Sequence, residues 1–168
     1  ENFNPCFVLD LTATPKKESN IISYVDAVQL KNEHMVKLPV IVYNRDSQAE
    51  VLIDAIDLRN KLEEIADAEY AKTGKYIRPI ALFQAQPKGK EDATTFEKLR
   101  DKLVDKGIPA EQIAIRTADV NELKNADLMS PSSPIRYIIT VNALKEGWDC
   151  PFAYILASLA NKTSQVDV

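Results

Sequence analysis

The sequence predicts an α/β domain built on a parallel sheet with helices on both of its faces. Strand-type and helix-type stretches alternate through the second half of the chain, as is typical of parallel strands joined by crossover helices. The polar stretch Val141–Pro151 contains one glycine and lies between two apolar runs, Ile135–Val141 and Ala153–Leu159. An α/β protein places a ligand site at such a turn, beside the carboxyl edge of its sheet.

The composition is that of one globular domain, or of one domain with part of a neighbour. The 168 residues are 45% hydrophobic, and no apolar run approaches the roughly 20 residues that a membrane helix needs. No signal peptide opens the chain, so we expect a cytoplasmic protein without a membrane partner. The chain does not begin with methionine, and we expect a fragment of a longer protein. The net charge of −4 argues against a protein that coats DNA, but not against a motor that touches few phosphates.

The cysteines and the histidine predict no metal chemistry. Two reduced, buried thiols at Cys6 and Cys150 are favoured over a disulfide. His34 is the only histidine, and no cluster of cysteine and histidine exists in the sequence, so we expect no metal site.

Three elements are expected before residue 47. Cys6–Leu11 is a short apolar run of buried-strand type. Residues 21–30 carry apolar side chains at roughly helical spacing, with Ser19 or Asn20 as the N-cap. Val36–Tyr43 follows as a strand or an extended linker.

The longest helical pattern is Ser47–Lys72, which Gly74 ends. Its core face is expected to carry Val51, Ala55, Leu58, Leu62 and Ile65. A buried strand, Tyr76–Phe83, comes next, and Thr94–Glu97 then has the form of a capping box. The helix that this box opens ends at Gly107 and Pro109. Ile113–Thr117 is a short strand, and residues 121–128 are expected to form one or two helical turns.

Three places along the chain offer groups that suit a phosphate ligand. Thr12, Ala13, Thr14 and Pro15 end the first apolar run, and their two hydroxyls either relay hydrogen bonds to a phosphate site or simply cap a strand end. Gln84 and Thr94 bracket a loop with two lysines, and the helix N-terminus near Thr94 favours a nucleic-acid phosphate, although a plain core strand explains the same pattern.

The third place is the turn at Lys145, Gly147 and Asp149. It offers a cation, a backbone that a ligand can approach closely and a carboxylate. A tight turn in which Asp149 caps backbone N–H groups is the alternative. Trp148 is expected to pack between sheet and helix rather than to stack on a base.

These stretches resemble motifs of the superfamily 2 helicases and translocases. Thr12–Pro15 is similar to their Ser/Thr-Ala-Thr motif, and Ala81–Gln86 occupies the place of their fourth motif. Residues 143–154, Ala-Leu-Lys-Glu-Gly-Trp-Asp-Cys-Pro-Phe-Ala-Tyr, look most like the fifth motif of the restriction (Res) subunit of type III restriction-modification enzymes. Many family members carry threonine where Val141 stands and arginine where Glu146 stands.

The resemblance implies two RecA-like motor lobes. Residues 1–36 would be the end of the first lobe and a linker, and residues 37–168 most of the second, helicase C-terminal lobe, truncated at its end. Thr12, Ala13, Thr14 and Pro15 would couple nucleotide hydrolysis to motion. Gly147 and Asp149 would bind nucleotide, and the nucleic-acid contacts would come from Gln84, Thr94 and Lys145.

The resemblance also implies an ATP-dependent type III site-specific endodeoxyribonuclease and helicase. Its cofactors would be ATP and Mg²⁺, and its partners double-stranded DNA and a methyltransferase and specificity (Mod) subunit. The chain lacks a Gly-Lys-Ser/Thr loop, an Asp-Glu pair and the arginine motif that phosphoryl transfer needs, so no catalytic set is complete and the fragment alone is predicted to be inactive.

Three alternatives stay open. One is a superfamily 2 DNA helicase without a nuclease, and another is a non-catalytic α/β module that binds a protein partner. The third is a small enzyme with Cys150 as its nucleophile, which the lack of an evident base near Cys150 disfavours.

Overall fold

The computed structural model describes residues 6–12, 15–33, 35, 40–87, 94–141 and 148–159. The chain divides into two compact units, one of Glu1–Tyr43 with Thr163–Val168 and the other of Asn44–Lys162. The assignment of residues 1–36 and 37–168 to two motor lobes stays a prediction.

The first unit contains one short helix, α1 (Ala27–Asn32), among its described residues. Asp26 caps it, because its carboxylate accepts a hydrogen bond from the Gln29 N–H at 2.7 Å and the Gln29 side chain accepts one from the Asp26 N–H. The helix predicted over residues 21–30 therefore forms only from Ala27 onward, and its predicted cap at Ser19 or Asn20 is wrong. The apolar residues before Asp26 have no regular structure and are exposed.

The predicted buried strand Cys6–Leu11 is also wrong. These residues are exposed and form no strand, because no described residue pairs with their backbone and an unpaired strand has little to stabilise it. The prediction of a buried Cys6 fails with it, whereas Cys150 is buried as expected. Both thiols are free.

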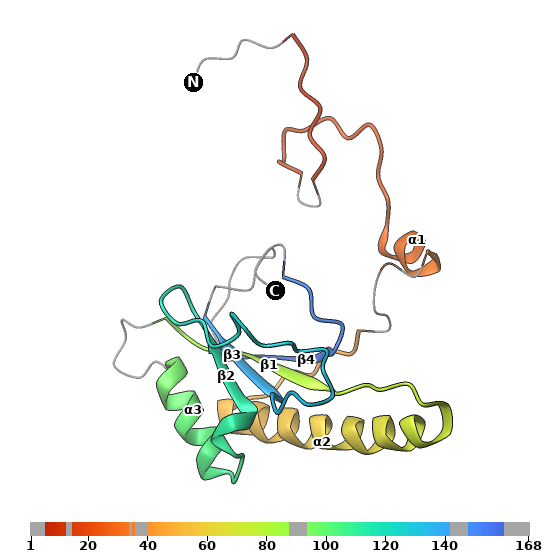
Figure 1. Ribbon diagram of the computed structural model, residues 1–168. Coiled ribbons are helices and arrows are strands. Elements are labelled where there is room, and N and C mark those ends of the chain that lie inside the picture. The colour runs from red at the N-terminus through yellow and green to blue at the C-terminus, as the bar shows by residue number, and fades with distance from the viewer. Residues whose placement is uncertain are drawn as a thin grey trace. The chain divides into compact units, whose positions relative to one another are not determined.

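The second unit is built on a four-stranded sheet of β1 (Ile80–Gln84), β2 (Ile113–Arg116), β3 (Tyr137–Thr140) and β4 (Ala153–Ser158). The strand order is β2-β3-β1-β4, and all three pairings are parallel (Figure 1). This arrangement confirms the α/β class and the parallel sheet that the alternation of strands and helices predicted.

The helices of this unit are α2 (Gln48–Thr73) and α3 (Phe96–Asp105), with a short 3₁₀ turn, η1 (Ala110–Gln112). The predicted ends of α2 are confirmed: the Ser47 hydroxyl accepts a hydrogen bond from the Glu50 N–H, and Gly74 ends the helix at a φ of 71°. The α3 cap is Thr95, one residue later than predicted.

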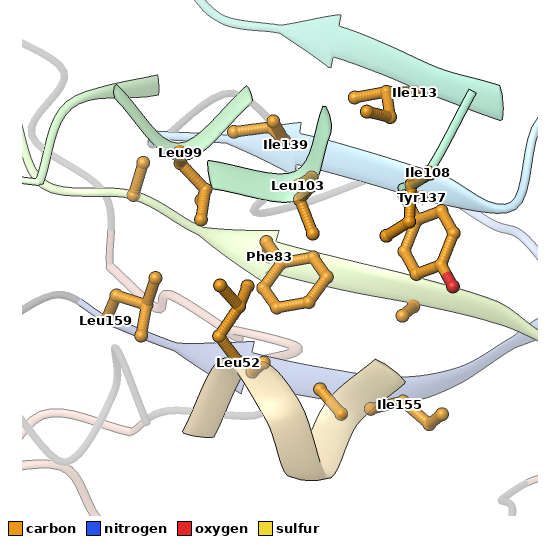
Figure 2. Close-up of a cluster of buried hydrophobic side chains, with 14 of the residues drawn as sticks. Leu52, Phe83, Leu99, Leu103, Ile108, Ile113, Tyr137, Ile139, Ile155 and Leu159 are labelled. Carbon is orange, nitrogen blue, oxygen red and sulfur yellow. The ribbon is translucent and has the colours of Figure 1, made fainter. Parts of the chain in front are cut away.

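Both of these helices pack on the same face of the sheet (Figure 1). Figure 2 shows the resulting core, in which side chains from α2 and α3 meet alternate residues of the strands. Its larger members are Leu52, Phe83, Leu99, Leu103, Ile108, Ile113, Tyr137, Ile139, Ile155 and Leu159. The prediction of helices on both faces is therefore wrong for the part of the chain that the structure describes.

The core face of α2 also differs from the predicted one. Its buried residues are Leu52, Ala55, Arg59 and Ala66, whereas Ile65 is 64% exposed. Apolar residues occur on several sides of α2, so their spacing alone does not select one face. Arg59 can face the sheet because its guanidinium lies 5.3 Å from the centre of the Tyr137 ring.

The opposite face of the sheet is covered by turns. Ile80, Ala114, Ile135, Ile138, Cys150 and Phe152 form its core. The helical turns predicted for residues 121–128 do not form, and the segment consists of tight turns. Arg78, which is buried, binds the carbonyl oxygens of Leu128, Ser130 and Ser133 and so holds the turns that follow this segment in place.

Candidate functional site

The last residue of each strand is polar. Arg116, Thr140, Gln84 and Ser158 are in register across β2, β3, β1 and β4, and we call them the polar row. In-register neighbours of a parallel sheet point to the same face, and for these residues it is the face opposite α2 and α3. The preceding row on that face is apolar, consisting of Ala114, Ile138, Leu82 and Leu156. The carboxyl edge of the sheet therefore presents hydrogen-bonding groups directly beyond an apolar surface.

One member of the polar row has no hydrogen-bond partner among the described residues. The Oγ1 atom of Thr140 is buried and unpartnered, and the residue is only 5% exposed. A buried hydroxyl without a partner costs about 1–3 kcal/mol, so such groups are rare and need an explanation. By contrast, the Ser158 hydroxyl donates to the Gln84 side-chain oxygen at 2.9 Å. This leaves the Gln84 side-chain nitrogen as a further donor in the row.

A second polar network joins the N-termini of α2 and α3 at the same edge. The Thr94 hydroxyl donates to the Gln48 side-chain oxygen at 2.6 Å, and the Gln48 side-chain nitrogen donates to the Leu159 carbonyl at 3.2 Å. The Thr94 N–H donates to the Gln86 side chain at 3.0 Å. Thr94 is buried and its hydroxyl donor is used within the protein, so it ties two helix ends to the sheet. Its contact with nucleic acid stays a prediction.

The described end of the glycine-containing turn approaches the opposite edge of the sheet. Asp149 is exposed, and Trp148 packs half-buried against the core of the face that no described helix covers, rather than between sheet and helix as predicted. The Phe152 carbonyl accepts a hydrogen bond from the N–H of Ile80, the first residue of β1. Lys145 and Gly147 lie outside the described residues. The structure therefore does not bring Asp149 together with the polar row, and the roles of these three residues stay predictions.

The remaining predicted site residues belong to the first unit. Thr12 and Pro15 are exposed, and Ala13 and Thr14 lie outside the described residues. Across the described ranges, no three histidine, cysteine, aspartate or glutamate side chains gather as metal ligands. No helix in the same ranges is long and apolar enough to cross a membrane.

A charged cluster of the buried Arg59 and the half-buried Glu63 and Arg136 lies at the amino end of β3, away from the polar row. Glu63 accepts hydrogen bonds from Arg59 and, at 2.8 Å, from Arg136. Burial lowers the pKa of Arg59, and burial raises the pKa of Tyr137 beside it. Each charge has a partner within the protein, so this cluster ties α2 to the sheet rather than forming a site.

The sequence analysis missed Arg116, Thr140 and Ser158. Each follows an apolar strand, which is a weak signal in a single strand. The signal becomes specific only when the strand register places the three residues beside Gln84. Comparison of the chain with protein-family models, curated proteins and solved structures finds no match.

Proposed function

We propose that residues 37–168 are most of the second, RecA-like lobe of a cytoplasmic, ATP-dependent DNA translocase of the type III restriction kind. Residues 1–36 would then end the first lobe. The observation that best supports this proposal is the polar row with its unpartnered Thr140 hydroxyl. The row ends a parallel sheet directly before the stretch that resembles the fifth helicase motif.

The polar row suits the sugar–phosphate backbone of DNA. Arg116, Thr140 and the Gln84 nitrogen are donors on adjacent strands, and adjacent strands lie about 4.8 Å apart. Contacts to phosphate position a protein on a duplex without reading its sequence, which is what a translocating lobe requires. A few such donors also fit the net charge of −4, because DNA would be bound at a few local contacts rather than over a broad basic surface.

The chain does not supply the machinery for ATP hydrolysis. Its sequence has no Gly-Lys-Ser/Thr loop to hold the phosphates and no Asp-Glu pair for Mg²⁺, so we assign no hydrolytic step to its residues. Gly147 and Asp149 would contribute one wall of a nucleotide site in the complete enzyme. Duplex DNA and a methyltransferase and specificity subunit would be the partners of that enzyme.

The test is the DNA-stimulated ATPase activity of the complete enzyme that carries this chain. Thr140→Val should lower the DNA stimulation about tenfold, because a hydrogen bond to a charged phosphate is lost. It should leave the free energy of unfolding unchanged or raise it by about 1 kcal/mol, because the removed hydroxyl has no partner in the described part of the chain. Asp149→Ala should lower ATPase activity while the fold persists.

Thr117→Val is the matched control at the same edge. The Thr117 hydroxyl already accepts a hydrogen bond from the Val120 N–H at 3.0 Å, so its loss should reduce stability without a selective loss of DNA stimulation. Full DNA-stimulated ATPase and DNA cleavage in both Thr140→Val and Asp149→Ala would show that the assignment is wrong. An enzyme without any ATPase activity would favour the protein-binding module.

A further inference from the structure

An apolar groove lies between α2 and α3, on the face opposite the polar row. Leu52, Leu99 and Leu159 are buried at its floor, and Figure 2 shows them toward the carboxyl end of the strands. Ile53, on the wall formed by α2, is 41% exposed. A lone exposed isoleucine needs no explanation, but this one extends a buried leucine floor out to solvent. The groove is thus a continuation of the core that the described residues do not fill.

The size of the groove limits what it can hold. Its volume is about 220 Å³. Pockets for cofactors and drug-sized ligands are larger, at roughly 300–1,000 Å³, so a nucleotide does not fit here. A groove of this volume suits one large apolar side chain, as in the anchor positions of protein–peptide interfaces.

The rim of the groove carries excess positive charge. Lys102 and Lys106 lie four residues apart, so they follow one another on the same side of the helix at the end of α3. Asp105 is the only acidic residue among the described residues that line the groove. Neither lysine forms a salt bridge with another residue in the described part of the chain. The pair is therefore available to a negatively charged partner.

We propose that this groove binds a peptide segment of a partner protein, which inserts one large apolar side chain flanked by carboxylates. The apolar side chain would contact Leu52, Leu99 and Ile53, and the carboxylates would face Lys102 and Lys106. Rim charges act mainly on the association rate and on the salt dependence, whereas the anchor carries most of the affinity. The inference rests on the groove and not on the translocase proposal, because the two sites lie on opposite faces of the sheet.

The probe is the acetylated and amidated peptide Glu-Glu-Phe-Leu-Glu, titrated into the ¹⁵N-labelled 168-residue chain. Saturable shifts are expected at the amides of Ile53, Leu99 and Lys102. A peptide with glutamine in place of glutamate should bind about threefold more weakly at low salt and equally at high salt. A peptide with serine in place of phenylalanine and leucine should not bind. The absence of saturable shifts up to about 1 mM peptide would overturn the proposal.

Matched variants keep the test specific. Ile53→Ser should weaken binding about tenfold, whereas Ile65→Ser, at an exposed isoleucine of the same helix outside the groove, should not change it. Lys102→Gln with Lys106→Gln should remove the difference between the glutamate and glutamine peptides, and Lys61→Gln with Lys72→Gln should preserve it. Equal binding by Ile53→Ser and Ile65→Ser, or self-association of the chain that the peptide does not displace, would contradict a peptide-binding groove.

Discussion

The Tyr137 side chain should control the stability of the fold at high pH. It is 2% exposed, and burial raises its pKa above the usual value of 10.0. Just above pH 10, the folded protein therefore keeps the phenol proton of Tyr137, whereas the unfolded chain releases it. The free energy of unfolding should fall as the pH rises above about 10, with the full contribution present below that pH.

Urea unfolding of the chain from about pH 8 to about pH 11 measures this effect. Tyr137→Phe should flatten the decline above pH 10, because no phenol then has to ionise on unfolding. Tyr70→Phe, at a tyrosine that is half-exposed, is the control. If the free energy of unfolding of Tyr137→Phe declined as steeply as that of the unsubstituted chain, groups other than Tyr137 would cause the pH dependence.

Arg78 shows why single residues were the hardest to place from the sequence. An arginine before Pro79 and an apolar strand looks like a strand-edge charge, yet it is almost fully buried. Its acceptors are backbone carbonyls 50–55 residues later, and any residue type could have supplied them. Thr140 differs from Arg78 because its buried hydroxyl has no partner among the described residues. Neither its burial nor the missing partner can be seen in the sequence.

At the scale of the elements, α2 should depend on its N-terminal cap. The Ser47 hydroxyl accepts the Glu50 N–H, and the Glu50 carboxylate accepts the Ser47 N–H, each at 3.2 Å. Ser47→Ala should lower the free energy of unfolding by about 1 kcal/mol. Thermal or urea unfolding measures the change, with Ser23→Ala as an exposed serine outside any helix cap. Equal stability of the two variants would mean that the cap contributes nothing.

The two ends of α2 and the C-terminal end of α3 were predictable because their signals are local, whereas the cap of α1 at Asp26 was missed. Ser47 and Gly74 bound α2, and Gly107 follows α3 with a φ of 86°, which glycine adopts at little cost. The buried face of α2 was not predictable, since packing on the sheet selects it from several apolar sides. Strand positions in the second unit followed from apolar runs, whereas the apolar run Cys6–Leu11 forms no strand. The order and register of the strands depend on contacts distant in sequence. The polar row could not be predicted from the sequence, because it depends on that register.

At the scale of the whole molecule, the two units should differ in hydrogen exchange. The first unit has no buried side chain among its described residues, whereas Ile138 and Ile139 of β3 are fully buried. Amides of Ile21–Val25 should exchange nearly as fast as in an unfolded peptide, and amides of β1 and β3 only through global unfolding. Mass spectrometry of peptic peptides measures the exchange rates of the two groups of amides separately. Comparable protection in both regions would reveal packing of the first unit that its described residues do not account for.

The central position of β1 has a consequence for biosynthesis. Its neighbours are β3 and β4, which leave the ribosome more than fifty residues after it, and the three carbonyl groups that Arg78 needs lie 50–55 residues after Arg78. A nascent chain that stops before residue 128 carries an apolar strand with two open edges and an uncompensated guanidinium. Such truncated products are candidates for chaperone capture and degradation, and the sheet closes only after β4 has been synthesised.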